Sequence, residues 1–250
     1  MSLPTPFFRD AFVTLYCGDA LEIVKHLEPG SFSAVVTDPP YNETSLEWDR
    51  WPTGWPSAVA HLSNSLWCFG SMRMFLEKRG EFAGWNFAQD IVWEKHNGSG
   101  MAVDRFRRVH ECAVHFYREK WANVFKAPVY RSDSEARVFS RNTSPPHFGA
   151  VKNSATYKPK AARVPMERSV IFCRSCHGHA IHPTQKPEGI MRPLIQYSVP
   201  AGGLVLDPFA GSGTTLLVAK QEGRRSVGIE RSPEYCQAIV ERLGQGVMTL

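Results

Sequence analysis

The run Thr37-Asp38-Pro39-Pro40-Tyr41 combines hydrogen-bond acceptors with a flat aromatic ring in one short turn. Two consecutive prolines hold the backbone in a rigid, extended turn. The Asp38 carboxylate and the Pro39 carbonyl can therefore both accept hydrogen bonds from one amino group, and Tyr41 offers a face on which a planar base can stack. A plain Asp-Pro-Pro turn with a packing tyrosine would contain the same residues, so this run alone leaves its role open.

A second run, Leu204-Val-Leu-Asp-Pro-Phe-Ala-Gly-Ser-Gly-Thr-Thr215, predicts a buried strand, a glycine-rich turn and the start of a helix. Glycines let the backbone approach a ligand closely, and a helix N-terminus offers free N–H groups. Glu230 ends the next expected strand, where an acid can bind ribose hydroxyls. A P-loop requires a lysine directly after this glycine, whereas Gly213 is followed by Thr214. A nicotinamide-binding fingerprint requires a third glycine, and Leu216 occupies that position. By itself, the turn is a weak signal of a nucleotide-like ligand.

Alternating strands and helices would position both runs. We expect strands over 12–16, 33–37, 66–69, 87–93, 111–117, 203–206 and 225–229, and helices over 20–27, 71–79, 187–197, from 214, and over 233–243. This alternation predicts an α/β domain whose doubly wound, mostly parallel sheet is covered by helices on both faces. Asp38 would then lie at the carboxyl end of a strand, where open α/β sheets bind ligands.

Together the two runs resemble the amino-group DNA methyltransferases that use S-adenosylmethionine, and their order is that of the β class. Further matches are Gly18-Asp19-Ala20, Ile91-Val-Trp-Glu-Lys95, His110-Glu111, His182-Pro-Thr-Gln-Lys-Pro187 and Gly228-Ile-Glu230. The resemblance covers roughly 1–117 and 169–244. It implies a Rossmann-like methyltransferase fold, a single domain over 1–250. The segment 118–168, rich in Arg, Lys, Ser, Asn and Pro, would be its target-recognition insertion.

The resemblance also implies roles for individual residues. Asp38, Pro39, Pro40 and Tyr41 would be catalytic. Asp19 and Ala20 would hold the cofactor's adenine, Glu230 its ribose, and Thr184 and Lys186 its methionine carboxylate. The full set of expected S-adenosylmethionine-binding residues is Asp19, Ala20, Asp38, His182, Thr184, Lys186, Asp207, Phe209, Ala210, Gly211, Ser212, Gly213, Thr214, Glu230 and Arg231.

The implied reaction is methyl transfer to an exocyclic amine of a DNA base. Such an amine is a poor nucleophile, and Asp38 with the Pro39 carbonyl would orient its N–H bonds for direct transfer. The base would be flipped out of the duplex and stacked on Tyr41. Asp rather than Ser before Pro-Pro-Tyr favours adenine N6 in this family, with cytosine N4 as the alternative. Cytosine C5 methylation needs a cysteine after a proline, and none of the six cysteines follows one.

Positive charge is concentrated in the middle of the chain. Residues 97–180 hold 15 Lys or Arg against 6 Asp or Glu, while the whole chain has a net charge of +5. Basic residues interleaved with aromatics suit contacts with phosphates and bases of double-stranded DNA. The expected DNA-binding residues are Arg105, Arg107, Arg108, Arg131, Arg137, Arg141, Lys152, Lys158 and Lys160. A solvated basic loop, an RNA-directed enzyme or a nucleic-acid-binding module without catalysis would fit the same charges.

Composition limits the class of protein further. With 43% hydrophobic and 21% charged residues, the chain is typical of a globular domain, and no apolar run approaches the ~20 residues of a membrane-spanning helix. The chain opens without a signal-peptide pattern, and its cysteines suggest reduced thiols, so we expect a cytoplasmic protein of prokaryotic or phage type. The family often dimerises, so a homodimer and a cognate restriction endonuclease are the further partners considered.

One cysteine pattern raises the question of a metal. Cys173-Arg-Ser-Cys176-His177 matches a haem-attachment spacing and, with His179 and His182, resembles a zinc-ligand set. Haem attachment requires export, and no signal-peptide pattern is visible in the sequence. A closed zinc site would need a second Cys/His pair at a suitable spacing, and the sequence offers none. We therefore expect a plain loop here and no metal.

Overall fold

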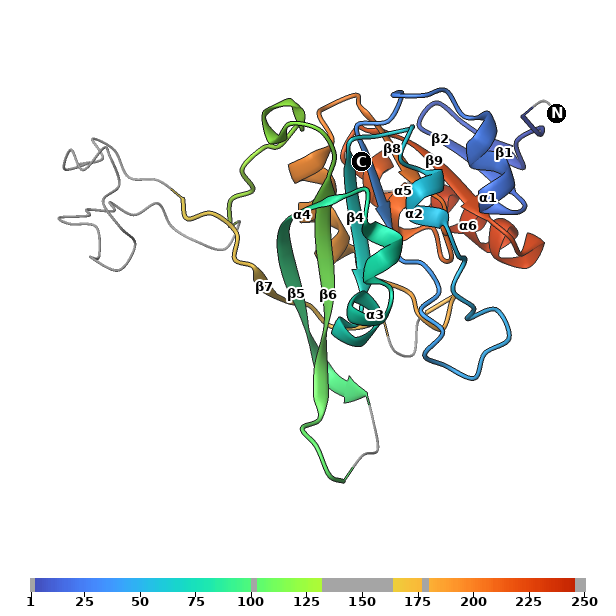
Figure 1. Cartoon of the computed structure of the whole chain (residues 1–250). Helices are drawn as coiled ribbons and strands as arrows, with labels where there is room; N and C mark the ends of the chain where they lie inside the picture. Colours follow the sequence, from blue (N-terminus) through green and yellow to red (C-terminus); the bar gives the residue numbers. More distant parts are fainter. Residues whose placement is uncertain (1–2, 100–102, 132–163, 177–179, 246–250) are drawn as a thin grey trace, which may run out of the picture. The chain divides into compact units, whose positions relative to one another are not determined.

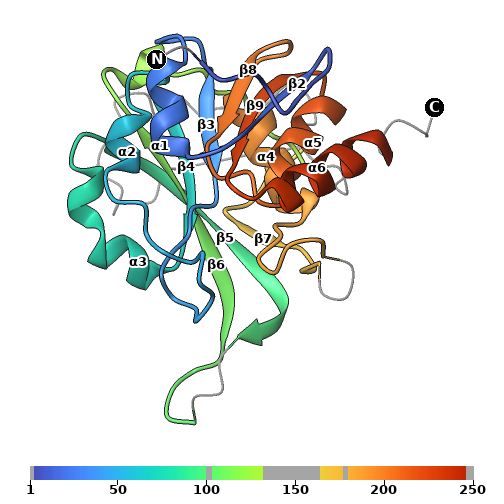
Figure 2. The ribbon, with the colours of Figure 1, turned by 90° about the vertical axis from the view of Figure 1, so that its right-hand side faces the viewer.

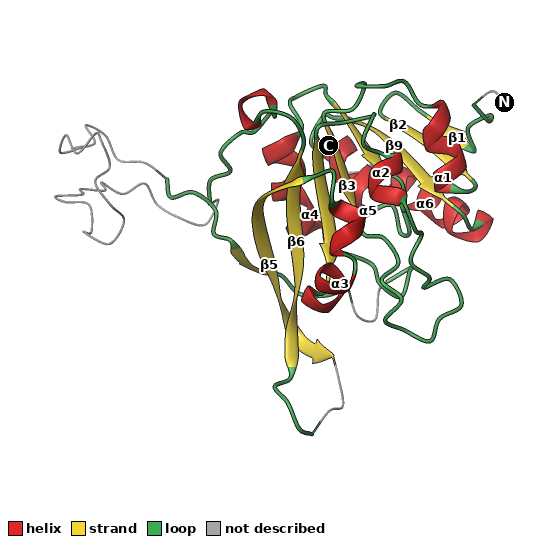
Figure 3. Cartoon of the chain, viewed as in Figure 1, coloured by secondary structure: helices red, strands yellow, loops and turns green. Residues whose placement is uncertain are grey.

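The computed structural model describes residues 3–99, 103–131, 164–176 and 180–245. The chain divides into two compact units, residues 1–127 together with 169–250, and residues 128–168. In the larger unit, the described residues form one nine-stranded sheet with helices on both faces (Figures 1 and 3). The α/β class and the mostly parallel sheet expected from the sequence are thus confirmed.

The elements follow the predicted alternation closely. The strands are β1 (Phe8–Arg9), β2 (Val13–Cys17), β3 (Ala34–Thr37), β4 (Ser65–Gly70), β5 (Asn86–Ser99), β6 (Arg108–Tyr117), β7 (Val170–Phe172), β8 (Leu204–Asp207) and β9 (Arg225–Glu230). The α-helices are α1 (Ala20–Ile23), α2 (Trp55–Ala58), α3 (Met72–Glu77), α4 (Glu188–Ser198), α5 (Thr214–Gln221) and α6 (Pro233–Gln245), with short 3-10 turns over 24–26, 79–82 and 121–123. Three short elements, β1, α2 and β7, were not predicted.

The sheet order is β1-β2-β9-β8-β3-β4-β6-β5-β7. The five central strands β2, β9, β8, β3 and β4 run parallel, as buried strands between two helical layers do. β6 pairs antiparallel with both β4 and β5, and β7 returns parallel to β5. Every residue of β3 and β4 is buried, which explains why these two strands are continuous apolar runs in the sequence.

Alternate residues of the central strands enter different cores. Val35 packs with α1, α2 and α3 residues in one cluster, whereas Ala34 and Val36 pack with α4 and α5 in another. Figure 2 shows this division, with α1, α2 and α3 on one side of the sheet and α4, α5 and α6 on the other. Because successive side chains of a strand point to opposite faces of the sheet, one run of residues packs against both helical layers.

The chain reverses its direction of travel across the sheet between β3 and β8. From β3 it proceeds through α2 to β4 on one side, and from β8 through α5 to β9 on the other. The register aligns the carboxyl ends of these strands, because Cys17 is opposite Glu230 and Asp207 is opposite Gly228. Such a switch point opens a crevice at the carboxyl edge of the sheet, where α/β folds bind ligands.

The β5–β6 hairpin extends beyond that same edge. Gly70, the last residue of β4, is opposite Cys112, so β6 residues before Cys112 project past the end of β4. β5 and β6 stay paired as far as Ser99 and Arg108. In Figures 1 and 2 the hairpin is the long arm that leaves the sheet.

The second unit occupies most of the predicted insertion. Within it, the structure describes residues 128–131 and 164–168, which are joined by an antiparallel bridge between Tyr130 and Met166. Residues 118–127, assigned to the insertion from their composition, belong to the larger unit. Target recognition by this segment remains a prediction. Within the described chain, no helix combines the length and apolar character needed to cross a membrane.

Candidate functional site

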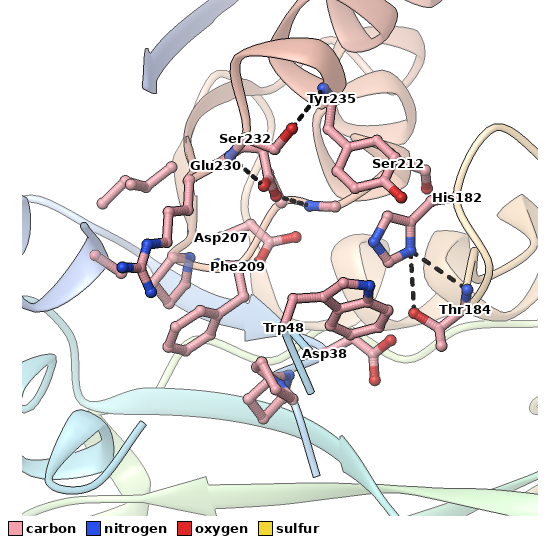
Figure 4. A pocket seen from close by; sticks show the side chains of 18 of the residues that line it. Asp38, Trp48, His182, Thr184, Asp207, Phe209, Ser212, Glu230, Ser232 and Tyr235 are labelled. Carbon is pink, nitrogen blue, oxygen red and sulfur yellow. Dashed lines mark hydrogen bonds between the residues drawn. The ribbon is translucent and has the colours of Figure 1, made fainter. Parts of the chain in front are cut away.

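A cavity of about 510 Å³ opens at the carboxyl edge of the sheet, beyond the ends of the neighbouring strands β3 and β8. Figure 4 shows side chains that line it. The segments that follow β2, β3, β8 and β9 all contribute to its lining. Eighteen expected site residues gather around it: Asp19, Ala20, Asp38, Pro39, Pro40, Tyr41, His182, Thr184, Lys186, Asp207, Phe209, Ala210, Gly211, Ser212, Thr214, Glu230 and Arg231 line the cavity directly, and Gly213 lies in the same turn without lining it.

Gly213 faces away from the cavity. Its φ of +71° lies in the left-handed region, and a Cβ built there would be 2.8 Å from Cγ2 of Ile239 on α6. A side chain at this position would therefore meet α6, and contact between the Gly213 backbone and the cofactor remains a prediction. The glycine is needed for the turn itself and for packing against α6.

Asp38 directly follows β3 and is held from two sides. The Tyr41 hydroxyl donates a hydrogen bond to Oδ1, and Lys186 Nζ donates one to Oδ2. Burial raises the pKa of Asp38, although the positive charge of Lys186 acts in the opposite direction. The side chain is 17% exposed, and it faces the cavity together with Trp48 and Phe209 in Figure 4.

Lys186 lies between two carboxylates. Besides Asp38, it contacts Oε2 of Glu111 at 3.2 Å, and its own side chain is 5% exposed. Burial disfavours the charged ammonium, but Asp38 and Glu111 outweigh burial and raise the pKa of Lys186. The resemblance implied a contact between Lys186 and the methionine carboxylate of the cofactor. In this structure its ammonium is paired with side chains of the chain itself.

Asp207 ends β8 and joins the two motif-bearing strands. Thr37 Oγ1 donates to its Oδ1 at 2.7 Å, and Thr215 Oγ1 donates to its Oδ2 at 2.6 Å. Burial raises the pKa of Asp207 to about 6, even though both hydroxyls favour the ionised form. Asp207 thus connects the end of β3, the end of β8 and the start of α5.

Two acids mark the other end of the cavity. Glu230 accepts the Gly211 N–H on Oε2 at 2.8 Å and the Ser232 N–H on Oε1 at 2.9 Å. Burial raises the pKa of Glu230 despite these bonds. Asp19 caps α1 by accepting the Leu21 N–H on Oδ1 at 2.8 Å. Each carboxylate retains lone pairs through which it can accept further hydrogen bonds.

An aromatic group borders the cavity beside Thr184. The His182 ring lies between Trp48, at a centroid distance of 5.0 Å, and Tyr235, at 4.5 Å (Figure 4). The Thr184 N–H donates to His182 Nδ1 at 3.3 Å. Burial lowers the pKa of His182 to about 4, so the ring is neutral at pH 7 and accepts this bond.

Asp49 orders the segment that follows the Asp38 turn. Its buried carboxylate accepts backbone N–H groups from Asn42 at 2.8 Å, Glu43 at 2.9 Å and Thr44 at 2.7 Å. Burial opposes ionisation of Asp49, but the bonds from Thr44, Asn42 and Glu43 hold its pKa below the usual value. The neighbouring Trp48 is thereby placed at the cavity.

The expected DNA-binding residues divide into two groups. Arg105, Arg107 and Arg108 lie on the β5–β6 arm, with Phe106 fully exposed between them. Arg108 also forms an ion pair with Glu43 at 3.5 Å, which connects the arm to the segment after Tyr41. Arg131 lies in the smaller unit and has a partner of its own. Arg137, Arg141, Lys152, Lys158 and Lys160 lie outside the described residues.

No three His, Cys, Asp or Glu side chains among the described residues are placed to hold a metal ion. Cys173 follows β7 and donates its backbone N–H to Glu94 O at 3.1 Å. Cys176 is half-buried, and residues 177–179 lie outside the described chain.

Sequence reasoning missed several residues around the site: Trp48, Asp49, Lys95, Glu111 and Tyr235. Lys95 and Glu111 belonged to segments matched by resemblance, but no role was attached to them. The signal that could have indicated a role is one charged residue of each sign in two neighbouring strands, because charged residues are rarely buried without a partner. In the structure the two side chains form a buried ion pair between the antiparallel strands β5 and β6. Trp48 and Asp49 lie in an irregular segment with no periodic pattern.

Several known proteins are similar to this chain in sequence and in fold. A family model described as DNA methylase, of the N6 and N4 type, matches residues 32–241. Type II methyltransferase M.ScaI of Streptomyces caespitosus is 27% identical over 272 positions, which cover 97% of this chain and 84% of that protein. Type II methyltransferase M.HpaI of Haemophilus parainfluenzae is 26% identical, with 92% and 73% covered.

Two solved structures are similar over nearly the whole chain. The M1.HpyAVI–SAM complex has a TM-score of 0.61 and 26% identity, covering 92% of this chain and 99% of that one. The cytosine-N4-specific PvuII DNA methyltransferase has a TM-score of 0.64 and 18% identity, with 96% and 93% covered. The second likeness concerns the fold alone.

Proposed function

This chain belongs to the N6/N4 DNA methylase family and is a DNA methyltransferase that uses S-adenosylmethionine, and on this basis we propose that it methylates the exocyclic N6 amine of adenine in double-stranded DNA. The observation that supports the proposal best is the position of Asp38 and Tyr41 at a cavity that also contains Asp19 and Glu230. One cavity thus offers acceptors for a target amine and for a nucleoside cofactor.

The donor and acceptor groups of the cavity fit S-adenosylmethionine. Glu230 uses one bond per oxygen for Gly211 and Ser232, which leaves lone pairs for two ribose hydroxyls. Asp19 and the Ala20 backbone would hold the adenine, beside the apolar ring of Phe209. The hydroxyls of Thr184 and Ser212 would meet the methionine end. When bound, the cofactor supplies the methyl group.

Asp38 and the Pro39 carbonyl would activate the acceptor. Both accept hydrogen bonds, so they would hold the two amine hydrogens and direct the nitrogen lone pair toward the methyl group. In the transfer, positive charge builds on that nitrogen, and the Asp38 carboxylate offsets it. One amine proton then leaves, with its bonding electron pair remaining on nitrogen, and Asp38 is the nearest base that could accept it.

The target base must leave the duplex to reach Asp38. A flipped base would stack on Tyr41, whose hydroxyl donates to Asp38 and so fixes the ring beside the carboxylate. Arg105, Arg107 and Arg108 on the arm, which leaves the same edge of the sheet, would contact DNA phosphates. The segment 118–168 would read the target sequence.

Other partners follow from the relatives. Two similar proteins are named Type II methyltransferases, so a cognate restriction endonuclease is a further expectation. A homodimer and a cytoplasmic location of prokaryotic or phage type also remain expectations from the sequence.

Mass spectrometry of nucleosides tests the reaction. Purified protein is incubated with mixed-sequence plasmid DNA and S-adenosylmethionine, and the digested DNA is analysed for methylated bases. N6-methyladenine is expected. N4-methylcytosine would mean that the target base is cytosine, but methyl transfer to an exocyclic amine would still hold, because the family contains both types. A 5-methylcytosine product, or DNA binding with no methyl incorporation, would overturn the proposal.

A further inference from the structure

Four charged side chains of alternating sign form a continuous row that ends at the cavity. Lys95 Nζ pairs with Glu111 Oε1, Glu111 Oε2 lies 3.2 Å from Lys186 Nζ, and Lys186 pairs with Asp38 Oδ2. Their side chains are between 5% and 17% exposed. Buried charges are costly to desolvate, so a row of four must be held by mutual contacts.

The sheet places this row behind the cavity wall. Lys95 lies on β5 and Glu111 on β6, where it is directly opposite Trp93. Lys186 comes from the segment before α4, and Asp38 from the end of β3. Asp38 and Lys186 line the cavity, whereas Lys95 and Glu111 do not. Glu111 therefore does not contact a bound base itself, and it can act only through Lys186 and through its charge on Asp38.

We propose that Glu111 is a positioning residue for methyl transfer, because it shares the Lys186 ammonium with Asp38 and so lets Lys186 orient Asp38 without cancelling its negative charge. This inference rests on the proposed function above. A lysine paired with Asp38 alone would neutralise the carboxylate that must hold the amine and offset the charge developing on its nitrogen. Two carboxylates around one ammonium keep a net negative charge beside the acceptor, and Lys95 balances the outer end of the row.

The charges around Asp38 give this role a signature in pH dependence. Asp38 faces Lys186, Tyr41 and Glu111, and it also interacts with the buried Asp207 and Cys68. Burial raises the pKa of Asp38, Lys186 lowers it, and the negative charge of Glu111 raises it. Neutralising Glu111 should therefore lower the pKa of Asp38. Neutralising Lys95, which lies beyond Glu111, should raise it.

The decisive experiment compares pH profiles of kcat on duplex DNA for the wild type, Glu111→Gln and Lys95→Gln. Glu94→Gln is the matched control, because Glu94 precedes Lys95 on β5 and its side chain is exposed. We expect Glu111→Gln to lower kcat on the order of 10–100-fold, as loss of an orienting outer partner does in metal sites. The acid limb of the kcat–pH profile of this variant should move to lower pH. Its KM for DNA and its Kd for S-adenosylmethionine should stay within twofold of the wild type.

The two neutralisations should shift the acid limb in opposite directions. Lys95→Gln should move it to higher pH, Glu111→Asp should recover part of kcat, and Glu94→Gln should match the wild type. A loss of kcat without any shift of the limb, or shifts of the same sign in both variants, would overturn the proposal. If Glu111→Gln fails to fold, Lys95→Gln still tests the proposal, because an acid limb that stays in place or moves to lower pH in that variant would contradict it.

A measurement without catalysis separates this inference from the proposed function. Carboxyl ¹³C NMR of the cofactor-free protein follows the titration of Asp38 directly in the wild type, Glu111→Gln and Lys95→Gln. Opposite shifts of its pKa support the coupling, and unchanged titration contradicts it, whether or not DNA is methylated. Absence of methyl transfer by the wild type would instead refute the proposed function.

Discussion

Thr37 Oγ1 donates a hydrogen bond to Asp207 Oδ1 at 2.7 Å, which ties the end of β3 to the end of β8 across 170 residues of sequence. The turn proposed to be catalytic begins one residue after Thr37, at Asp38, and the glycine-rich turn begins after Asp207. The relative position of the two motifs is therefore set by the same buried carboxylate that Thr215 also contacts.

Replacing Thr37 with Val should destabilise the fold by about 1–3 kcal/mol, because Oδ1 of the buried Asp207 carboxylate loses one of its two donors and keeps only the Phe209 N–H at 3.1 Å. Urea unfolding monitored by tryptophan fluorescence measures the change. Thr14→Val, at a half-buried position on β2, is the control and should cost less. Equal stability of the two variants would mean that the bond contributes nothing.

Asp207 should also make stability depend on pH. Its pKa rises from an ordinary 3.8 to about 6 in the fold, so the folded state binds the proton more tightly than the unfolded state. The associated stability is fully present below pH 4 and is lost as pH rises through 6, a decrease of about 3 kcal/mol at 1.36 kcal/mol per pH unit. Asp207→Asn should remove this slope. Unfolding free energies of both proteins at pH 4 and pH 7 provide the comparison, and identical slopes would contradict it.

Asp38→Ala should lower the rate of methyl transfer on the order of 10²–10³-fold, by analogy with the loss of one oxyanion-hole donor. Asp38→Asn should be milder, because an amide oxygen still accepts a hydrogen bond. Single-turnover kinetics with radiolabelled cofactor measure the rate, and calorimetry checks that the cofactor still binds. Full activity of Asp38→Ala would exclude Asp38 from the chemistry.

Tyr41→Ala should cost about 1–3 kcal/mol in kcat/KM, the usual contribution of stacking between a base and an aromatic ring. Tyr41→Trp should recover much of that loss. Tyr41→Phe separates the ring from the hydroxyl, which donates to Asp38. If Phe and Ala behaved alike, the hydrogen bond rather than stacking would be the function of Tyr41.

Arg107→Glu should weaken DNA binding. The slope of the logarithm of the binding constant against the logarithm of the salt concentration should become shallower by about 0.9 for each phosphate that the protein no longer neutralises. Lys25→Glu, an equal charge change on an exposed residue after α1, is the control. Arg137 and Arg141 in the insertion can be tested in the same way. Fluorescence anisotropy over a range of salt concentrations gives affinity and slope together. An unchanged slope would show that the arginine is merely solvated, and cofactor affinity should not change in any case.

The sequence predicted the residues whose position depends on a strand end. Asp38, Asp207 and Glu230 each follow a buried apolar run, and parallel strands bring such ends to one edge. It did not predict the roles of Lys95 and Glu111, because the pairing of Lys95 with Glu111, and of Glu111 with Lys186, depends on the antiparallel pairing of β6 with β4 and β5. Gly213 was assigned to the correct turn. Its contact with Ile239 was not predicted, because that contact depends on the packing of α6, which no local sequence pattern encodes.

The carboxylate of Asp49 affects when conformational entropy is lost. Fixing the backbone of one residue costs about 1–2 kcal/mol, and Asp49 fixes Asn42, Glu43 and Thr44 through their N–H groups. That cost is met while the chain folds, before any DNA arrives. The wall that bears Trp48 is consequently preorganised, so that the free energy of association need not be spent on ordering it.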